Sequence, residues 1–309
     1  MPLLTVTLNP ALDKVQVVPD FHAGAVYKAS ETHTSAAGKG INVARVAHTL
    51  GGSVTALGFL GGAAGGYAAE CLRREGIAHR IVPISGETRT SVIVSDPVNR
   101  RDTVLNEAGP HISPEELNDF RSLLRELLPT AKTVSYSGSL PPGVPSSFYA
   151  EAIELARELG VKTALDTSGI ALVQGAAARP FLLKPNWQEL VALGDESEGG
   201  WAGAAAALRG RFGCEVAIVT DGERGAVLAC ADGLWECAAP TVEVVSAVGS
   251  GDSFLAGFLW AWDDGRGPEE ALRWATAAGA ANARRYGSGF CTRAEIETLV
   301  ASSLPRKLG

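Results

Sequence analysis

The chain has 309 residues, a formal net charge of −7, 46% hydrophobic residues and 20% charged residues, which is typical of a globular protein with one large α/β domain or two smaller ones. The negative charge, with Lys and Arg scattered singly, argues against nucleic acid or an anionic membrane surface as the main partner. No apolar stretch approaches the roughly 20 residues that span a bilayer, and the N-terminus lacks a signal-peptide pattern. The five cysteines are widely spaced and form no C-x-x-C pair, so we expect neither a zinc ribbon nor a disulfide framework, and a reducing cytoplasm is the predicted compartment.

The first third of the chain mixes buried elements with half-exposed ones. A continuous apolar run predicts a buried strand, strict alternation predicts a half-exposed strand, and apolar residues at helical spacing predict a helix. The predicted elements are a buried strand at 3–8, half-exposed strands at 13–18 and 26–33, a helix at 40–50, a strand at 53–60, a helix at 67–75, and exposed strands at 90–95 and 102–106.

From residue 113 onward, strands and helices alternate regularly. The predicted helices are 114–128, 146–159, 188–193, 202–211, 253–263, 269–284 and 293–299, and the predicted strands are 133–137, 162–166, 182–184, 215–220, 226–229 and 233–237. Repeated strand–helix alternation predicts a doubly wound α/β fold, a mostly parallel sheet with helices on both faces. The exposed strand pairs do not fit that alternation, so we expect a small extra sheet that forms a lid, at about 12–34 and 88–108, on a single domain spanning residues 1–309.

The most informative motif is Val248-Gly249-Ser250-Gly251-Asp252-Ser253, which precedes an apolar run. Backbone N–H groups in such a glycine turn point into one concavity, and a helix N-terminus adds positive partial charge, so the motif is suited to hold an anion. The carboxylate of Asp252 beside it could accept a proton from a hydroxyl. An anion cradle with a general base is what phosphoryl transfer to an alcohol requires. The structural alternative is a tight turn in which Asp252 only caps the helix.

Polar clusters follow several predicted strands. Ligands of open parallel sheets bind at the carboxyl ends of the strands, so the recurrence favours a binding site there, although each cluster alone could be an ordinary loop. Gly38-Lys39-Gly40 lacks the spacing of a P-loop and of a dinucleotide fingerprint, so any nucleotide is bound in another way. The clusters are at 9–13, 36–42, 137–143, 166–169, 184–189 and 220–222.

The residues also resemble a known family. The segments AAGKGINVAR (36–45) and VVSAVGSGDSFLAGF (244–258) closely resemble the two signatures of the ribokinase-like, PfkB-type carbohydrate kinases. The similarity extends along the chain through TLNPALD, TRTS, SGSLPPGV, LDTSG, KPNWQEL and ATAAGAANA. Within the family, the motifs are most similar to kinases of phosphorylated ketohexoses, which are 1-phosphofructokinase, tagatose-6-phosphate kinase and the minor 6-phosphofructokinase. Gly38-Lys39-Gly40 is similar to the first two. The segments AAGKGINVAR and VVSAVGSGDS favour 1-phosphofructokinase, and Glu107-Ala108-Gly109-Pro110 favours the tagatose enzyme.

The resemblance implies a role for each matching position. Asp252 matches the catalytic base, and the amides of Gly249, Ser250 and Gly251 match the anion hole. The positions that match the sugar-phosphate site are Asp13, Gly38, Asn42, Arg89 and Ser139, with Lys28 and Lys39 as further cations. The positions that match the nucleotide site are Lys184, Asn186, Thr220, Gly222, Gly225 and Asn282. Asn186 and Glu189 also match the pair that organises Mg²⁺ through water.

Two departures from the family pattern and two other classes of protein need consideration. Ser246-Ala247 stands where most of the wider family has Asp-Thr-Thr or Asn-Thr, and Asp221 stands beside the expected polyphosphate site, so its side chain is expected to point away.

A hydrolase with a serine nucleophile at Gly251-Asp252-Ser253 needs a downstream histidine, but the five histidines all lie upstream. A non-catalytic sugar-phosphate sensor should have lost Asp252 or the glycines, and both are present.

The motifs predict phosphoryl transfer to an alcohol, and the resemblance implies an ATP- and Mg²⁺-dependent kinase of a ketohexose phosphate. The first choice of reaction is fructose 1-phosphate to fructose 1,6-bisphosphate. Tagatose 6-phosphate is the alternative substrate, followed by fructose 6-phosphate. The lid strands carry an apolar face with free edges, which is a liability in a monomer, so we expect a homodimer that pairs through the lid.

Overall fold

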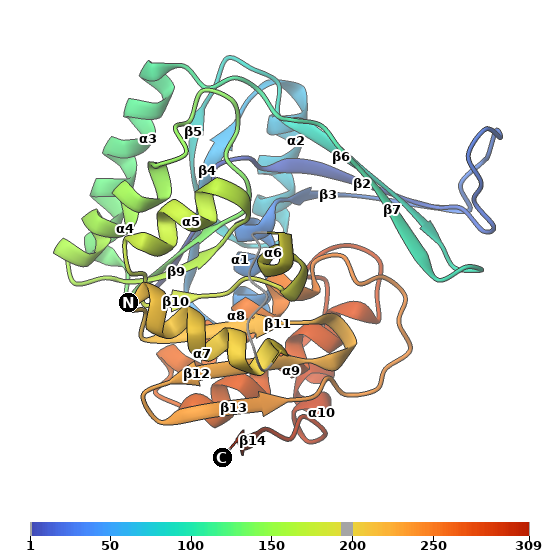
Figure 1. Ribbon diagram of the computed structural model, residues 1–309. Helices are drawn as coiled ribbons and strands as arrows, with labels where there is room; N and C mark the ends of the chain where they lie inside the picture. Colours follow the sequence, from blue (N-terminus) through green and yellow to red (C-terminus); the bar gives the residue numbers. More distant parts are fainter. Residues whose placement is uncertain (1, 193–199, 309) are drawn as a thin grey trace.

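The computed structural model describes residues 2–192 and 200–308 and contains two separate sheets (Figure 1). The larger is a 10-stranded sheet in the order β14-β13-β12-β11-β10-β9-β8-β1-β4-β5, and the smaller is a four-stranded sheet in the order β3-β2-β6-β7. The predicted combination of a large, mostly parallel sheet with a small extra sheet is therefore confirmed. Residue 193, the last of the predicted helix 188–193, lies outside the described residues.

The larger sheet is parallel between every pair of neighbours from β5 to β11 and antiparallel from β11 to β14. The carboxyl ends of β1, β8, β9, β10 and β11 consequently meet at one edge of the sheet. The strands are β1 Leu3–Thr7, β4 Val54–Leu60, β5 Ala78–Pro83, β8 Thr133–Ser137, β9 Lys162–Asp166, β10 Leu182–Leu183, β11 Val216–Thr220, β12 Ala226–Cys230, β13 Gly233–Cys237 and β14 Arg306–Leu308.

Helices cover both faces of the larger sheet. Alternation along the strands divides the core, since Val216 and Ile218 of β11 pack with one group of helices while Ala217 and Val219 pack with the other. On one face lie α1 Lys39–Thr49, α2 Gly62–Arg74, α8 Ser250–Asp263, α9 Pro268–Ala283 and α10 Arg293–Val300. On the other lie α3 Pro114–Leu127, α4 Phe148–Glu158, α5 Gly169–Ala177, α6 Trp187–Ala192 and α7 Gly200–Phe212.

The smaller sheet projects away from the larger one as a long, narrow extension (Figure 1). It consists of β2 Ala11–Val17, β3 Glu31–Ala37, β6 Arg89–Asp96 and β7 Arg101–Asn106. Strand β2 pairs parallel with β6 and antiparallel with β3, and β6 pairs antiparallel with β7. Because β2 and β3 directly follow and precede elements of the core, their inner ends lie beside the carboxyl end of β1.

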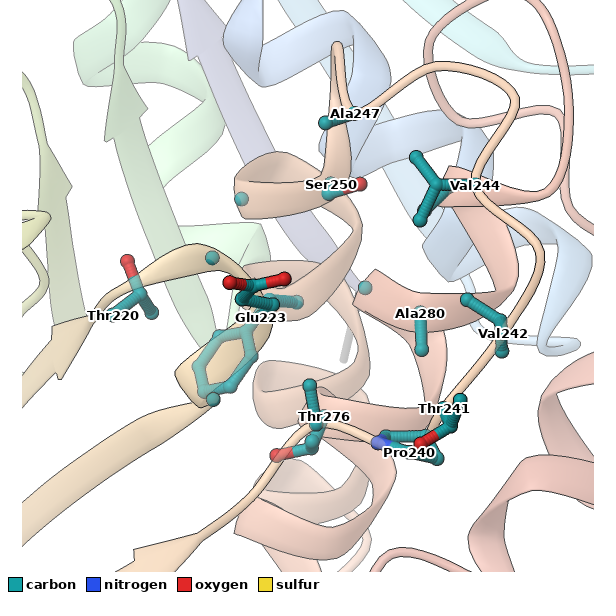
Figure 2. A pocket seen from close by; sticks show the side chains of 17 residues that line it. Thr220, Glu223, Pro240, Thr241, Val242, Val244, Ala247, Ser250, Thr276 and Ala280 are labelled. Carbon is teal, nitrogen blue, oxygen red and sulfur yellow. The ribbon is translucent and has the colours of Figure 1, made fainter. Parts of the chain in front are cut away.

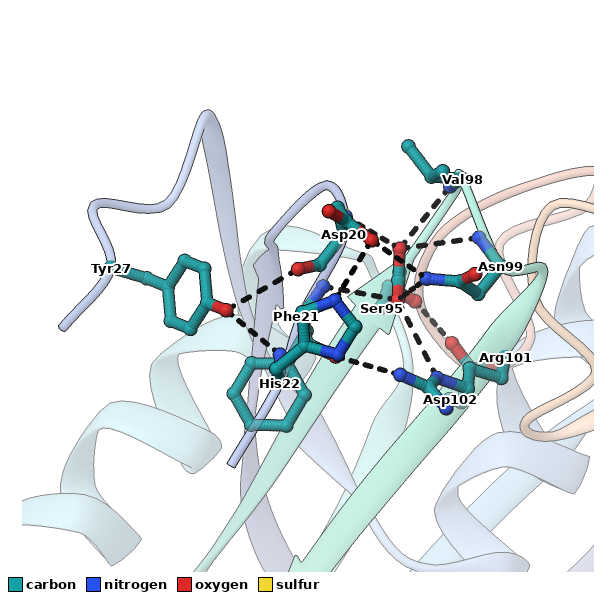
Figure 3. Close-up of polar contacts among 10 residues, drawn as sticks. Asp20, Phe21, His22, Tyr27, Ser95, Val98, Asn99, Arg101 and Asp102 are labelled. Carbon is teal, nitrogen blue, oxygen red and sulfur yellow. Dashed lines mark hydrogen bonds and ion pairs between the residues drawn. The ribbon is translucent and has the colours of Figure 1, made fainter. Parts of the chain in front are cut away.

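The far end of the smaller sheet is organised around the buried carboxylate of Asp96. It accepts hydrogen bonds from the amides of Asp20 and Phe21, over 2.8 and 3.1 Å, and from the Asn99 side chain over 2.8 Å (Figure 3). Arg101 lies 3.5 Å from the same carboxylate. These bonds tie the β2–β3 connection to the β6–β7 turn.

Several predicted boundaries were wrong. Strand β3 runs over Glu31–Ala37 rather than 26–33, because residues 26–30 belong to an exposed loop. Helix α2 begins at Gly62 rather than 67, since its first turn consists of small residues without an apolar pattern. Helix α5 and strands β5 and β14 were not predicted. Strand β5 lies at the edge of the sheet beside β4, and Val82 is the one buried residue of the six in this strand.

The described residues bear on two expectations from composition. The five cysteines are free thiols. Among residues 2–192 and 200–308, every helix is too short or too polar to cross a bilayer.

Candidate active site

The N-terminus of α8 carries the glycine turn that the sequence predicts to bind an anion, here called the anion-binding turn. Its N-cap, Gly249, has φ +82°, and a Cβ there would lie 2.6 Å from the Cβ of Ser288, so only glycine fits. The first N–H groups of a helix have no acceptor within it and carry positive partial charge. The amide of Ser250 already donates to the carbonyl of Ala247 over 3.1 Å, so the proposed anion hole rests mainly on the amides of Gly249 and Gly251.

Asp252 lies in the first turn of α8 and is 6% exposed. Burial raises the pKa of its carboxyl to about 6, although the ammonium group of Lys39 acts in the opposite direction. The Nδ2 of Asn42, from α1, donates to its Oδ2 over 2.7 Å. A buried carboxylate that is held in place and has a raised pKa is suited to accept a proton near neutral pH.

Arg45 fixes the orientation of Asn42, and the sequence reasoning did not single it out. Its Nη1 donates to Asn42 Oδ1 over 3.3 Å and to the carbonyl of Ser288 over 2.9 Å, and its Nη2 donates to the carbonyl of Ala36 over 2.8 Å. Glu75 balances its charge over 2.6 Å. The available signal was the spacing of three residues between Asn42 and Arg45, which places both on one face of α1.

Two lysines share the buried carboxylate of Asp166 at the end of β9. Lys39 Nζ lies 2.8 Å from Oδ1 and Lys184 Nζ lies 2.8 Å from Oδ2. Burial would raise the pKa of Asp166, but the two ammonium groups hold it below its ordinary value. The Nζ of Lys184 also lies 3.7 Å from where a Cβ of Gly251 would be, so a positive charge flanks the N-terminus of α8.

A cavity of about 540 Å³ lies where the smaller sheet meets the carboxyl ends of the strands, and it brings together most of the predicted sugar-phosphate residues. It is lined by Asp13, Gly38, Lys39, Asn42, Arg89 and Ser139, among others. Burial raises the pKa of Asp13 to about 6, while the guanidinium of Arg89 acts to lower it. Lys28 is not brought to this cavity, because it is an exposed residue of the β2–β3 connection.

Arg89 is held by carbonyl groups of the cavity wall. Its Nε and Nη2 donate to the carbonyl of Asn9 over 3.2 and 3.0 Å, and its Nη1 donates to the carbonyl of Glu107 over 3.1 Å. A guanidinium has five N–H groups, so one on each Nη remains for a ligand. Ser139 contacts the same wall by accepting a hydrogen bond of 3.2 Å from Asn9 Nδ2.

A second cavity, of about 640 Å³, lies on the other side of the α8 N-terminus (Figure 2). It is lined by Thr220, Gly222 and Gly225, which the resemblance places at the nucleotide, and by Ser250 and Gly251 of the anion-binding turn. Figure 2 shows Ser250 at one end, Pro240, Thr241 and Thr276 at the other, and Glu223 between them. Asp221 is not among the lining residues and forms an ion pair with Arg224. No histidine lines either cavity within the described part of the chain, which removes the base that the hydrolase alternative needs.

Three residues that the resemblance placed at the nucleotide are not among those that line this cavity. Lys184 and Asn186 are not among its lining residues, and Asn282 is fully buried. Asn282 Nδ2 donates to the carbonyl of Val248 over 2.8 Å and to Ser250 Oγ over 3.2 Å, and its Oδ1 accepts from the amide of Gly289 over 2.6 Å. Asn282 therefore braces the anion-binding turn.

Asn186 and Glu189 form a reciprocal cap at the start of α6. The Asn186 amide donates to Glu189 Oε2 over 2.8 Å, and the Glu189 amide donates to Asn186 Oδ1 over 2.7 Å. Glu189 also lines the cavity of about 540 Å³, and its Oε1 lies 3.5 Å from Lys39 Nζ. Within residues 2–192 and 200–308, no group of three His, Cys, Asp or Glu side chains forms a ready metal site. One available carboxylate oxygen fits Mg²⁺ that is held mainly by phosphates and water.

Comparison with known proteins agrees with this geometry. The family model of the pfkB carbohydrate kinases matches residues 7–295. A possible 1-phosphofructokinase from Thermotoga maritima is similar over 100% of both chains, with 28% identity and a TM-score of 0.91. Phosphofructokinase-2 from Escherichia coli, solved with substrates and products, is 27% identical over 98% of this chain and 99% of its own, with a TM-score of 0.91.

The fold is shared more widely than the detailed sequence. Ribokinase from Thermotoga maritima, at 22% identity, covers 97% of this chain and 99% of its own with a TM-score of 0.77, which shows a common architecture. The family model covers nearly the whole chain, including both glycine-containing turns and the buried acid of α8. The chain therefore belongs to the pfkB family of carbohydrate kinases.

Proposed function

We propose that this carbohydrate kinase transfers the γ-phosphoryl group of ATP to a ketohexose phosphate. The observation that carries the proposal is the position of Asp252, which is bonded to a residue of the polar cavity and lies one residue from the wall of the second cavity. The polar cavity holds the sugar phosphate, with Arg89 and Lys39 as cations. The second cavity holds the nucleotide, with its phosphates against the N-terminus of α8.

In the proposed reaction, Asp252 accepts the proton of the attacking hydroxyl. The hydroxyl oxygen forms a bond to the γ-phosphorus while the bond between that phosphorus and the β,γ-bridging oxygen breaks, which releases ADP. The amides of Gly249 and Gly251 face the charge that develops on the transferring group, and losing one such donor typically costs about 10²–10³-fold in rate. Mg²⁺ would neutralise phosphate charge, with Glu189 as its nearest carboxylate through water.

Fructose 1-phosphate is our first choice of substrate, with fructose 1,6-bisphosphate as the product. The support is the combination of two cations with a cavity large enough for a sugar phosphate, together with the similarity to a possible 1-phosphofructokinase. Tagatose 6-phosphate is the second candidate, because Glu107 and Ala108 of the motif that favours it line the cavity. Fructose 6-phosphate is the third candidate, since phosphofructokinase-2 is equally similar over the chain.

The experiment is to measure ADP release from ATP with each of the three sugar phosphates and with no sugar. We expect kcat/KM to be highest for fructose 1-phosphate. A higher value for either other sugar would replace the first choice while keeping the reaction class. No sugar-dependent ADP release with any ketohexose phosphate would overturn the proposed function.

We also infer that the smaller sheet, within about 12–34 and 88–108, acts as a lid and as a dimer interface. It carries Asp13 and Arg89 to the sugar cavity and exposes the apolar side chains of Val98, Val104 and Leu105 by 62, 41 and 61%. Light scattering at micromolar concentration, with and without sugar phosphate, tests the dimer. A monomer in both states, with lid amides protected from hydrogen exchange before sugar is added, would rule out both roles.

A further inference from the structure

A carboxylate of the smaller sheet contacts the segment that leads into the anion-binding turn. Ser246 Oγ donates to Asp102 Oδ2 over 2.8 Å, across 144 positions of sequence. Asp102 is on β7, and its Oδ1 accepts a hydrogen bond from Ser95 of the neighbouring strand β6 (Figure 3). Ser246 is only 4% exposed, so water competes little for this bond.

Ser246 is directly connected to the residues that form the anion-binding turn. Its Oγ accepts from the amide of Val248 over 3.4 Å, and its own amide donates to the carbonyl of Ala283 over 3.2 Å. The carbonyl of Val248 accepts from Asn282, which also bonds Ser250. A shift of the Ser246 hydroxyl is therefore transmitted to Val248, the residue directly before Gly249.

The smaller sheet makes a second contact, with the segment around Tyr286 that packs against the anion-binding turn. The rings of His33 on β3 and Tyr286 are stacked, with centroids 5.9 Å apart and an interplanar angle of 26°. Tyr286 precedes Ser288 by two residues, and Ser288 is the residue against which Gly249 packs. The smaller sheet thus contacts both chain segments that hold Gly249 in place.

The face of the sheet that makes these contacts is the face that lines the sugar cavity. Asp102 and Asn106 are four residues apart on β7, so their side chains are on the same side of the sheet. Asn106 lines the cavity with Asp13 and Ser91, which are aligned with it across β6 and β2. A ligand that fixes the inner end of this face therefore also fixes the strand that carries Asp102.

We propose that Asp102 is a positioning residue that couples the smaller sheet to the anion-binding turn. A sugar phosphate that holds the sheet through Asp13 and Arg89 then also holds Ser246, and through it the amides that receive the transferring phosphoryl group. The proposal rests on the proposed function for its kinetic consequence. The contact itself and its effect on the turn are independent of which sugar is phosphorylated.

The kinetic test compares Asp102→Ala, Asp102→Asn and Ser246→Ala with the wild type. Loss of a hydrogen bond to a charged group typically corresponds to about a tenfold or larger effect. We expect Asp102→Ala to lower kcat about tenfold while KM for the sugar phosphate changes less than about threefold. Asp102→Asn should restore most of the activity, because its amide oxygen can still accept from Ser246. The double variant with Ser246→Ala should be no worse than either single variant.

Thr103→Ala is the matched control, since Thr103 is the next residue of β7, is exposed and lies on the other face of the sheet. It should leave kcat unchanged. An equal loss in Thr103→Ala, or an unchanged kcat in Asp102→Ala, would overturn the proposal, because the first indicates general weakening of the strand and the second indicates no coupling.

Hydrogen exchange gives a readout that does not depend on activity. Amides of residues 246–252 should exchange faster in Asp102→Ala than in the wild type or Thr103→Ala. If the wild-type protein phosphorylates no ketohexose phosphate, the proposed function fails while faster exchange in this segment still supports the coupling. Unchanged exchange in that segment would overturn the coupling whatever the substrate.

Discussion

Asn42 Nδ2 lies 2.7 Å from Asp252 Oδ2, and Arg45 holds the amide of Asn42 in the orientation that makes this bond. Arg45 can only donate, so Asn42 Oδ1 must face it and Nδ2 must face Asp252. The bond engages one carboxylate oxygen of Asp252, and we expect the other, Oδ1, to be offered to the sugar hydroxyl. A helix-to-helix contact between α1 and α8 thus sets the direction in which the proposed base points.

Replacing Asp252 with Asn tests whether this carboxylate is the base. The amide keeps the shape of the side chain and cannot accept the proton, so we expect kcat to fall by several orders of magnitude. Nucleotide binding should be nearly unchanged, which a titration with a fluorescent ATP analogue would measure. Retention of more than about a tenth of kcat would show that another group accepts the proton.

We expect kcat/KM to fall as the pH is lowered through about 6. Burial raises the pKa of both Asp252 and Asp13 to about 6, and the proposed base is active only when it is ionised. Well below that pH we expect a loss of about tenfold for each pH unit from Asp252 alone, and above about pH 7 a plateau. An acid limb centred near pH 4, the ordinary range of a carboxyl, would contradict the assignment.

The same raised pKa predicts a pH-dependent gain in stability for Asp252→Asn. The pKa of Asp252 is about 6 in the folded chain against 3.8 for an unperturbed carboxyl, so folding favours the protonated form. That contribution is fully present below about pH 3.8 and is lost as the pH rises through 6. At pH 7.5 the variant should therefore have the higher Tm, and the difference should shrink at pH 5. A wild type that is more stable than the variant at pH 7.5 would show that the ionised carboxylate stabilises the fold.

Arg89→Ala should mainly weaken binding of the phosphorylated sugar. A charge-assisted contact to phosphate contributes about 1.5–3 kcal/mol, so we expect KM for the sugar phosphate to rise about 10- to 150-fold with little change in KM for ATP. The unphosphorylated ketose is the control substrate. An equal loss with that sugar would mean that Arg89 supports the cavity wall through Asn9 and Glu107 and does not read the phosphate.

Gly249→Ala should lower both Tm and kcat, because the new methyl group collides with Ser288 and displaces the turn. Gly265→Ala is a matched control. The two glycines have φ of +82° and +83°, but Gly265 has no atom within 4 Å of a Cβ position. The control therefore reports backbone strain alone, which we expect to cost about 1 kcal/mol. Similar losses of Tm and activity in the two variants would show that the contact with Ser288 is unimportant.

The larger sheet was predictable because most of its strands can be recognised from their own apolar sequences. Apolar strands that alternate with amphipathic helices favour a doubly wound sheet over other architectures. The observed bounds of β8, β9 and β11 lie within one residue of the predicted bounds. Strand β5 was missed because its short sequence shows neither a continuous apolar run nor strict alternation. Helix α5 was missed because it is apolar apart from Gln174, so no polar face marks a helical stripe.

The sequence identified many residues of the candidate site, but it could not show how they are arranged in space. The glycine turn before a predicted helix could identify Asp252, and the family resemblance could identify Gly38 and Arg89. No local pattern could show that Asn282 braces a turn 34 residues away in sequence. Nor could it show that Lys28 lies in an exposed loop and does not line the cavity. Those outcomes depend on contacts between segments that are far apart in sequence.

The trio of Lys39, Asp166 and Lys184 constrains how this chain can vary over evolutionary time. If Asp166 alone were lost, two ammonium groups would face each other in a buried space, and if one lysine alone were lost, the carboxylate would keep a single partner. Each single step is therefore costly even where the final combination is tolerable. The three positions should drift together or not at all among descendants of this sequence, so a relative that lacks one of them is expected to lack its counterparts.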